Sequence, residues 1–188
     1  MTNTAKQTET ILRSEAEPSP EDAARALDLV NEARGLVYEV LRPGRWPQQR
    51  TVRRFLEGDR LGRVLSLYRE AMELDPLEPA YPWNLASTLN RLGLHDLALA
   101  HIQRALRVSE AIGDDELGGS AAHYAWAEIA VNAGQYDVAL VALARARELV
   151  EGEGIADPDI DRLLAEIRGA VGDERCRELA ARLEALSA

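Results

Sequence analysis

The stretch AYPWNLASTLNRLGLHDLALAHIQRAL, residues 80–106, contains two helix-forming segments on either side of Gly93. Larger apolar residues recur three and four positions apart in both segments, which is the spacing of one buried helix face. Small residues stand at Ala86, Ala98 and Ala105, where two paired helices have to approach closely. The stretch therefore predicts two helices packed against each other, with the turn at Gly93.

Three prolines lie just before or within the start of this stretch, at Pro76, Pro79 and Pro82. The first four N–H groups of a helix have no partner inside the helix, so proline costs little there and much more farther in. If a helix begins at Pro79, Pro82 still falls in its first turn. The prolines predict a sharp joint between a helix that stops before Pro76 and the next one.

The pattern repeats along the chain. Ala71 and Ala105, each near the end of a helical segment, are 34 residues apart (105 − 71), and residues 123–150 repeat the pattern a third time. This spacing resembles the tetratricopeptide repeat family. The residues that carry the resemblance are Leu85, Ala86, Leu89, Gly93, Ala98, Ile102 and Ala105 in one repeat, and Trp126, Ala127, Ala130, Gly134, Tyr136, Ala139, Leu143 and Ala146 in the next. The resemblance implies an all-α helical repeat array, a right-handed α-solenoid.

The sequence departs from the family pattern in two places. Gly93 and Gly134 are 41 residues apart (134 − 93), which predicts an additional turn on each helix around Gly113. The first repeat is degenerate, because Val52 stands where a small residue is expected. Helices are expected at 20–41, 47–58, 60–75, 79–92, 95–112, 115–133, 136–150, 158–171 and 173–187.

The domain organisation follows from these segments. Residues 1–18 are expected to be a disordered tail, and residues 19–188 a single all-α domain. Ser19 followed by Pro20 is a helix start, with a side-chain cap and a preset φ. The repeats are expected over about 45–150, with the helix at 20–41 and the helices at 158–187 as the caps that repeat arrays need at their ends.

Composition limits the classes of protein. The single cysteine, Cys176, excludes an intramolecular disulfide framework and favours a reducing compartment, so we expect a cytoplasmic protein. The N-terminus does not resemble a secretory signal, and the longest apolar run, residues 138–144, is far shorter than the ~20 residues of a membrane span. The net charge of −10 argues against nonspecific binding to nucleic acid or to anionic membranes.

Catalytic and cofactor motifs were not found. The sequence has no glycine-rich phosphate loop, no paired helical histidines with a glutamate and no nucleophile elbow. Ser120 and His123 are near each other but lack an orienting third group, while His95 and His101 fall on different helix faces. The acidic segment 151–161 does not have the ligand spacing of a calcium loop. We expect no enzymatic activity, no cofactor and no metal.

The resemblance therefore carries the functional expectation, which is a protein–protein interaction adaptor that binds a partner segment in the concave groove lined by the first helix of each pair. Carried onto this sequence, the groove positions are Gln49, Arg50 and Arg53, then Trp83, Asn84, Ser87, Asn90 and Arg91, then Tyr124, Glu128 and Asn132. The alternative for the aromatic residues Trp83 and Tyr124 is packing against the next helix.

The sign of the partner's charge follows from a basic band. Residues 42–63 contain seven arginines against Glu57 and Asp59, a net charge of 7 − 2 = +5 in an acidic chain. We expect this band and the groove to be one surface, and the partner to present acidic or C-terminal carboxylate groups. Two other functions stay open: a nucleic-acid-binding accessory protein that uses the band, and a sensor whose conformation changes with a bound peptide.

Overall fold

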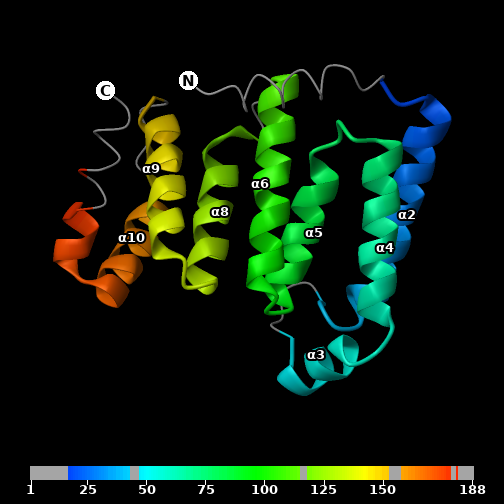
Figure 1. The fold of residues 1–188 in the computed structure, drawn as a ribbon, viewed down its shortest axis with the longest axis horizontal. Helices are drawn as coiled ribbons and strands as arrows, with labels where there is room; N and C mark the ends of the chain where they lie inside the picture. The colour runs from blue at the N-terminus through cyan, green and yellow to red at the C-terminus, as the bar shows by residue number, and fades with distance from the viewer. Residues whose placement is uncertain (1–16, 43–46, 115–117, 153–157, 179–180, 182–188) are drawn as a thin grey trace. The chain divides into compact units, whose positions relative to one another are not determined.

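The computed structural model describes residues 17–42, 47–114, 118–152, 158–178 and 181, and the regular structure in these ranges is entirely helical. The labelled helices are α2 (Pro20–Tyr38), α3 (Gln49–Leu56), α4 (Arg60–Leu74), α5 (Ala80–Arg91), α6 (His95–Ile112), α8 (Ser120–Asn132), α9 (Tyr136–Gly152) and α10 (Pro158–Val171) (Figure 1). Residues 173–178 are helical as well. The prediction of an all-α chain is confirmed.

The chain forms two compact units, residues 1–114 and residues 115–188. The expected single domain over 19–188 stays a prediction. The expected tail falls almost wholly on residues 1–16, which lie outside the described residues, as does most of the segment after residue 178.

Helices pair in each unit. In the first unit α2 packs along α4 and α5 packs along α6, and in the second α8 packs along α9 (Figure 1). Helix α10 packs against α9 and α8. The pairs α5/α6 and α8/α9 are joined by short turns, residues 92–94 and 133–135. These are the hairpins that residues 80–106 and 123–150 predicted.

The first pair differs from the assignment made from sequence. Residues 47–58 were expected to be its first helix, but α2 takes that place, with Ala26, Val30 and Ala33 buried. Two ion pairs bind α2 to α4, from Arg25 to Glu70 at 2.7 Å and from Arg63 to Glu32 at 2.9 Å. Helix α2 is therefore not only a capping helix, and α3 lies within the connection between the two helices of a pair.

Glycines follow α5, α6, α8 and α10 in the left-handed conformation, the last of them Gly172 with φ 85°. Gly93 has φ 79°, Gly113 has φ 72° and Gly134 has φ 70°. After Gly93, the Leu94 N–H donates to the Leu89 carbonyl oxygen at 2.9 Å, which satisfies a carbonyl at the end of α5. Gly113 ends the 18-residue α6, the longer helix expected there; the extra turn expected before α8 falls partly on residues 115–117, outside the described part.

The proline joint has the predicted geometry. Helix α4 ends at Leu74 and α5 begins at Ala80, one residue after the expected Pro79. A Glu78 carboxylate oxygen accepts from the Ala80 N–H at 2.9 Å, so a side chain satisfies one of the free donors at the helix start. Pro82 lies buried in the first turn of α5. At the start of α2, Ser19 caps the helix as expected, because its Oγ accepts from the Asp22 N–H at 3.1 Å.

Alanines form the centre of the helix pairs. The alanines Ala86, Ala98, Ala105, Ala127, Ala139 and Ala146 are all 0% exposed. A methyl group is the largest side chain that these positions accommodate without moving the paired helices apart.

We predict that Ala86→Phe destabilises the protein by about 1–3 kcal/mol, because the added ring overpacks the α5/α6 contact. Urea denaturation measures the effect. Ala100→Phe is the matched control, since Ala100 is exposed on α6 and its substitution should leave stability within about 0.5 kcal/mol. Equal stability of the two variants would show that Ala86 is not a close-packing position.

A second prediction concerns Gly93. No atom lies within 4 Å of the position that a Cβ would take there, so Gly93→Ala tests the backbone conformation alone. We expect a loss of about 1 kcal/mol from the positive φ. Gly62→Ala in α4, where the added Cβ is equally unobstructed, should instead stabilise by about 0.5–1 kcal/mol. A gain from both substitutions would contradict the left-handed turn.

Candidate functional site

The face of α5 that α6 leaves uncovered carries the five residues predicted for the second repeat. Ser87 is exposed, and Trp83, Asn84, Asn90 and Arg91 are half-buried. Positions 84, 87 and 91 follow one another at spacings of three and four, so they share one side of the helix. The buried residues of α5 include Leu85, Ala86 and Leu89.

Two of these five residues are already engaged within the protein. Asn90 Oδ1 lies 2.9 Å from His95 Nδ1, across the turn between α5 and α6. The Arg91 guanidinium donates to the backbone carbonyl oxygen of Arg42 at 3.2 Å. Asn84 and Ser87, by contrast, have no side-chain hydrogen bond to any described residue. These two side chains, with Trp83, are the part of the face most available to a partner.

The corresponding face of α8 is bordered by α10. Tyr124 is half-buried and Glu128 and Asn132 are exposed, at spacings of four. Arg162 of α10 donates to the Tyr124 hydroxyl oxygen at 2.7 Å. The Tyr124 hydroxyl is thus bonded to α10 within the same unit. Arg162 was missed from sequence, because it lies 38 residues from Tyr124 and no local pattern links them.

The three residues predicted for the first repeat lie on α3. Gln49, Arg50 and Arg53 are exposed on α3, which makes its main contact with α4 and is not the first helix of the pair. The Arg53 Nε donates to a Glu57 carboxylate oxygen at 2.9 Å. That these residues line one groove with those of α5 stays a prediction.

Helix α2, which does occupy the first position, has an open flank that sequence analysis did not assign. Leu27 is 51% exposed and Tyr38 is 60% exposed, with exposed Asn31 and Arg34 between them. At 100° per residue these four share one flank. Leu27 and Tyr38 fall outside the buried stripe of α2, so the helical spacing of the sequence could have indicated this exposed flank.

The two ion pairs between α2 and α4 show which side of α2 this flank is on. Arg25 and Glu32 of α2 reach residues of α4 that lie away from its buried Tyr68 and Met72. The flank with Leu27 and Tyr38 is therefore on the opposite side of α2 from these ion pairs. Arg34 on this flank is close enough to the buried Tyr68 to influence the pKa of its hydroxyl, which burial raises.

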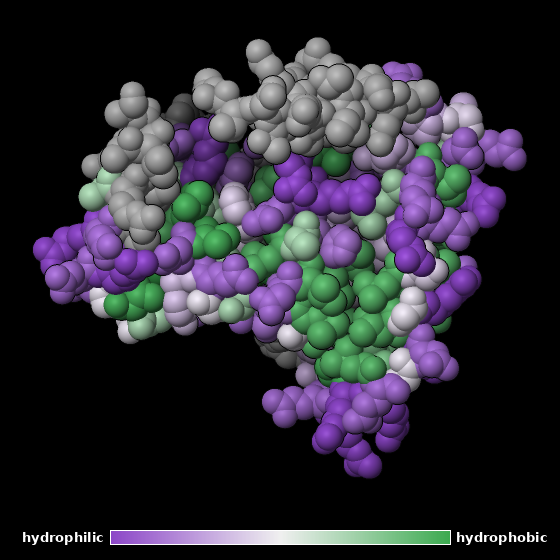
Figure 2. Space-filling view, in the orientation of Figure 1, coloured by the Kyte–Doolittle hydropathy of each residue, from purple (hydrophilic) through white to green (hydrophobic). Residues whose placement is uncertain are grey.

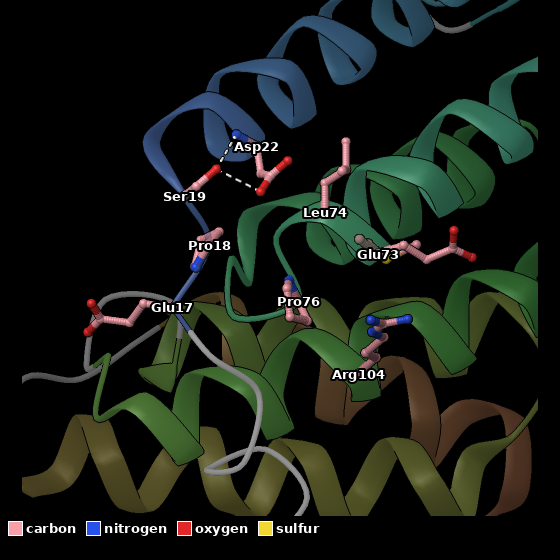
Figure 3. A pocket seen from close by; sticks show the side chains of 9 residues that line it. Glu17, Pro18, Ser19, Asp22, Glu73, Leu74, Pro76 and Arg104 are labelled. Carbon is pink, nitrogen blue, oxygen red and sulfur yellow. Dashed lines mark hydrogen bonds between the residues drawn. The ribbon is translucent and has the colours of Figure 1, made fainter.

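An open cleft of about 590 Å³ lies at the N-terminal end of α2, within the first unit (Figure 3). Its lining residues are Glu17, Pro18, Ser19, Asp22, Met72, Glu73, Leu74, Pro76 and Arg104. Ser19 and Asp22 are hydrogen-bonded to each other as the cap of α2. Three carboxylates against one guanidinium make the cleft unsuitable for the acidic partner that the sequence predicts.

The candidate dyad of Ser120 and His123 is not assembled. His123 is 6% exposed, and its Nδ1 has no hydrogen-bond partner among the described residues. Its ring packs against Trp126, with ring centroids 6.1 Å apart. Burial lowers the pKa of His123, and nearby Arg145 lowers it further. His123 is therefore a neutral packing residue.

Within the described ranges, no cluster of three or more histidine, cysteine, aspartate or glutamate side chains is arranged to hold a metal ion. None of the helices in those ranges has the length and apolar character needed to cross a membrane.

Comparison with protein families identifies the helix pairs. Residues 78–152, which include α5, α6, α8 and α9, match the model of the tetratricopeptide repeat. This stretch of the chain carries tetratricopeptide repeats. No curated protein and no solved structure matches it.

Tetratricopeptide repeats serve in general as non-catalytic modules for protein–protein interaction, and stacked repeats present extended binding surfaces. The matched residues coincide with the two pairs that have short turns. The pair α2/α4 lies outside the match, and the inserted α3 is the feature that distinguishes it from the other two pairs. The repeat region thus contains the α5 and α8 faces, whereas the α2 flank adds surface before it.

The buried His123 predicts a pH dependence of stability. Unfolded chains bind the imidazole proton at a pKa of about 6.5, whereas the folded pKa is lower. The contribution of neutral His123 to the free energy of unfolding is therefore fully present above about pH 6.5. It is lost as the pH falls through 6.5 toward the folded pKa. His123→Phe removes this contribution, so its unfolding free energy should fall less than that of the wild type between about pH 7.5 and 5.5.

Urea denaturation at the two pH values measures the difference. His101, whose pKa is also lowered by burial and by Arg104, remains in the variant, so the pH dependence should be reduced rather than abolished. An unchanged pH dependence would show that His123 can be protonated in the folded protein without cost.

Proposed function

We propose that this protein is an adaptor that holds a segment of a partner protein against the exposed face of α5, the first helix of a repeat. The observation that carries the proposal is the face of α5, where half-buried Trp83 lies next to Asn84 and near Ser87. An aromatic side chain supplies rigid contact area, while amide and hydroxyl groups can bind a peptide backbone. The two polar side chains lack partners among the described residues, so a bound peptide would displace only water from them.

The partner segment is proposed to carry carboxylate groups. Arg91 on α5 and Arg162 beside Tyr124 each place a guanidinium next to the respective face, and guanidinium groups bind carboxylates in pairs of hydrogen bonds. Arg91 donates to a backbone carbonyl oxygen, whereas Arg162 donates to the Tyr124 hydroxyl and is also paired with Asp159 at 3.4 Å. A carboxylate is a stronger acceptor than a carbonyl or a hydroxyl oxygen.

The proposal extends to the organisation and location of the protein. The repeats would act as one domain over 19–188. The single cysteine supports a reducing compartment, and we place the protein in the cytoplasm.

Site-specific photo-cross-linking tests the adaptor function. A photoreactive amino acid at Ser87, on the proposed face, should cross-link one contiguous segment of a partner in native lysate, identified by peptide mass mapping. The control places the same amino acid at Ala100, which is exposed on α6. A synthetic peptide of the cross-linked segment should then bind the purified protein in calorimetry, and Ser87→Trp should weaken it at least about tenfold, whereas Ala100→Trp should not.

Two results would count against the proposal. Cross-linking of the partner from position 100 but not from position 87 would move the binding surface to α6. Binding of the peptide with equal affinity to both tryptophan variants would exclude the α5 face.

A further inference from the structure

The α2 flank carries a single charge in a protein that is rich in charged residues. Its members are all exposed and lie on one side of the helix: Leu27, Asn31, Arg34 and Tyr38. The ionisable residues of α2 on the side that pairs with α4, among them Arg25 and Glu32, lie about 100° away around the helix axis. Charge is depleted and aromatic residues are enriched at the centre of protein-binding surfaces. The flank has that composition.

The hydrophobic area that Figure 2 shows on the first unit next to α3 and α4 is of another kind. Apolar residues of α4 outside its buried stripe, such as Leu61 and Leu65, are half-buried. The exposed large apolar side chains among the described residues are Leu27, Tyr38, Leu97, Ile112 and Val141. None of these belongs to α4, whereas two belong to the α2 flank.

The α2 flank adjoins the α5 face within the same compact unit. The buried Tyr68 of α4 is close to Arg34 of α2 and to Thr88 of α5, so it lies between the two helices. Thr88 is one turn from Asn84, on the side of α5 that faces α2. The Arg91 guanidinium of α5 also donates to the carbonyl oxygen of Arg42, just after α2. A segment bound at the α5 face can therefore continue onto α2.

The polar side chains of these adjoining surfaces select an extended segment. Asn31, Asn84 and Ser87 have no side-chain hydrogen bond to any described residue. Amide and hydroxyl groups bind backbone N–H and C=O groups, which are unpaired in an extended segment but already paired inside a helix. Arg34 has no ion pair with any described residue, and a guanidinium binds a carboxylate through two hydrogen bonds.

The large side chains of the flank set a spacing for the segment. Leu27 and Tyr38 are separated by roughly 16 Å along the axis of α2, with Arg34 between them. In an extended segment alternate side chains point the same way, and residues four apart are about 13 Å apart. The length of the tyrosine side chain makes up the difference. Two apolar side chains four residues apart thus reach Leu27 and Tyr38, and the residue midway faces the same side.

We propose that the partner segment of the α5 face continues along α2 and carries two large apolar side chains, four residues apart, with an aspartate or glutamate midway. The apolar side chains cover Leu27 and Tyr38, the carboxylate pairs with Arg34, and Asn31 binds the backbone. This partner chemistry rests on the proposed function, because it describes the segment bound at that face. Helix α2 precedes the residues that match the tetratricopeptide repeat, so it adds selectivity that the matched repeats do not supply.

Fluorescence anisotropy at low salt tests the proposal with three probes. The first is a labelled peptide of about nine residues with two leucines four residues apart, a glutamate midway and serines elsewhere. The second has serines in place of the leucines, and the third has glutamine in place of the glutamate. The wild type should bind the first probe at least about tenfold more tightly than the second and about threefold more tightly than the third.

The double variant Leu27→Ser with Tyr38→Ser should weaken binding of the first probe at least about tenfold. The matched control is Leu97→Ser with Ile112→Ser, which removes apolar side chains of similar exposure from α6 and should leave binding within about twofold. Because all four side chains are exposed, circular dichroism should show that both variants are folded.

A single substitution isolates the contribution of the charge. Arg34→Gln should abolish the preference for the glutamate probe over the glutamine probe, because the guanidinium that pairs with the carboxylate is gone. Arg69→Gln, at an exposed position on α4, changes the net charge equally and should keep the preference.

The proposal is overturned if the wild type does not bind the first probe, if it binds the serine probe as tightly, or if the α2 double variant binds as the wild type does. A control variant that loses as much affinity would overturn it as well.

The two proposals fail in different ways. If Ser87→Trp weakens the cross-linked partner peptide and the α2 variants do not, the adaptor function stands and the role of α2 is excluded. If the α2 variants weaken the first probe but position 87 cross-links no partner segment, the α2 flank binds peptide and the α5 face is excluded.

Discussion

The close approach of paired helices at alanine positions is the constraint on which the rest of this structure depends. Ala86 on α5 and Ala98 on α6 are fully buried, and Ala127 on α8 and Ala139 on α9 repeat the arrangement. Because no larger side chain separates the backbones there, the pair has one permitted rotation of each helix about its axis. That rotation decides which residues remain outside the contact, and therefore which residues a partner can reach.

The exposed faces follow from this packing. On α5 the residues Leu85, Ala86 and Leu89 are buried. On the opposite side of the helix Trp83 and Asn84 are half-buried and Ser87 is exposed. The left-handed glycines and the proline joint keep the helices in register by ending each at a defined residue. Residues outside the buried stripe of α5 are therefore the ones that can serve recognition.

The sequence predicted the features that local patterns encode. The turn at Gly93, the cap at Ser19 and the joint at Pro79 each lie within one residue of the expected place, since their causes lie within a few residues. The pairing of α2 with α4 was missed because 21 inserted residues, 39–59, separate the two helices and hide the 34-residue spacing. Long-range side-chain contacts, such as Arg162 with Tyr124, depend on that packing and leave no local signal.

The central claim is that α2, rather than the inserted α3, forms the first helix pair with α4. Methyl nuclear Overhauser spectroscopy tests it most directly, because Val30 and Val37 of α2 and Val64 and Leu67 of α4 are all buried. The account predicts strong cross-peaks between the methyl groups of α2 and those of α4. It would be contradicted if the α4 methyl groups showed no cross-peaks to α2 and instead gave their strongest ones to Val52 and Leu56 of α3.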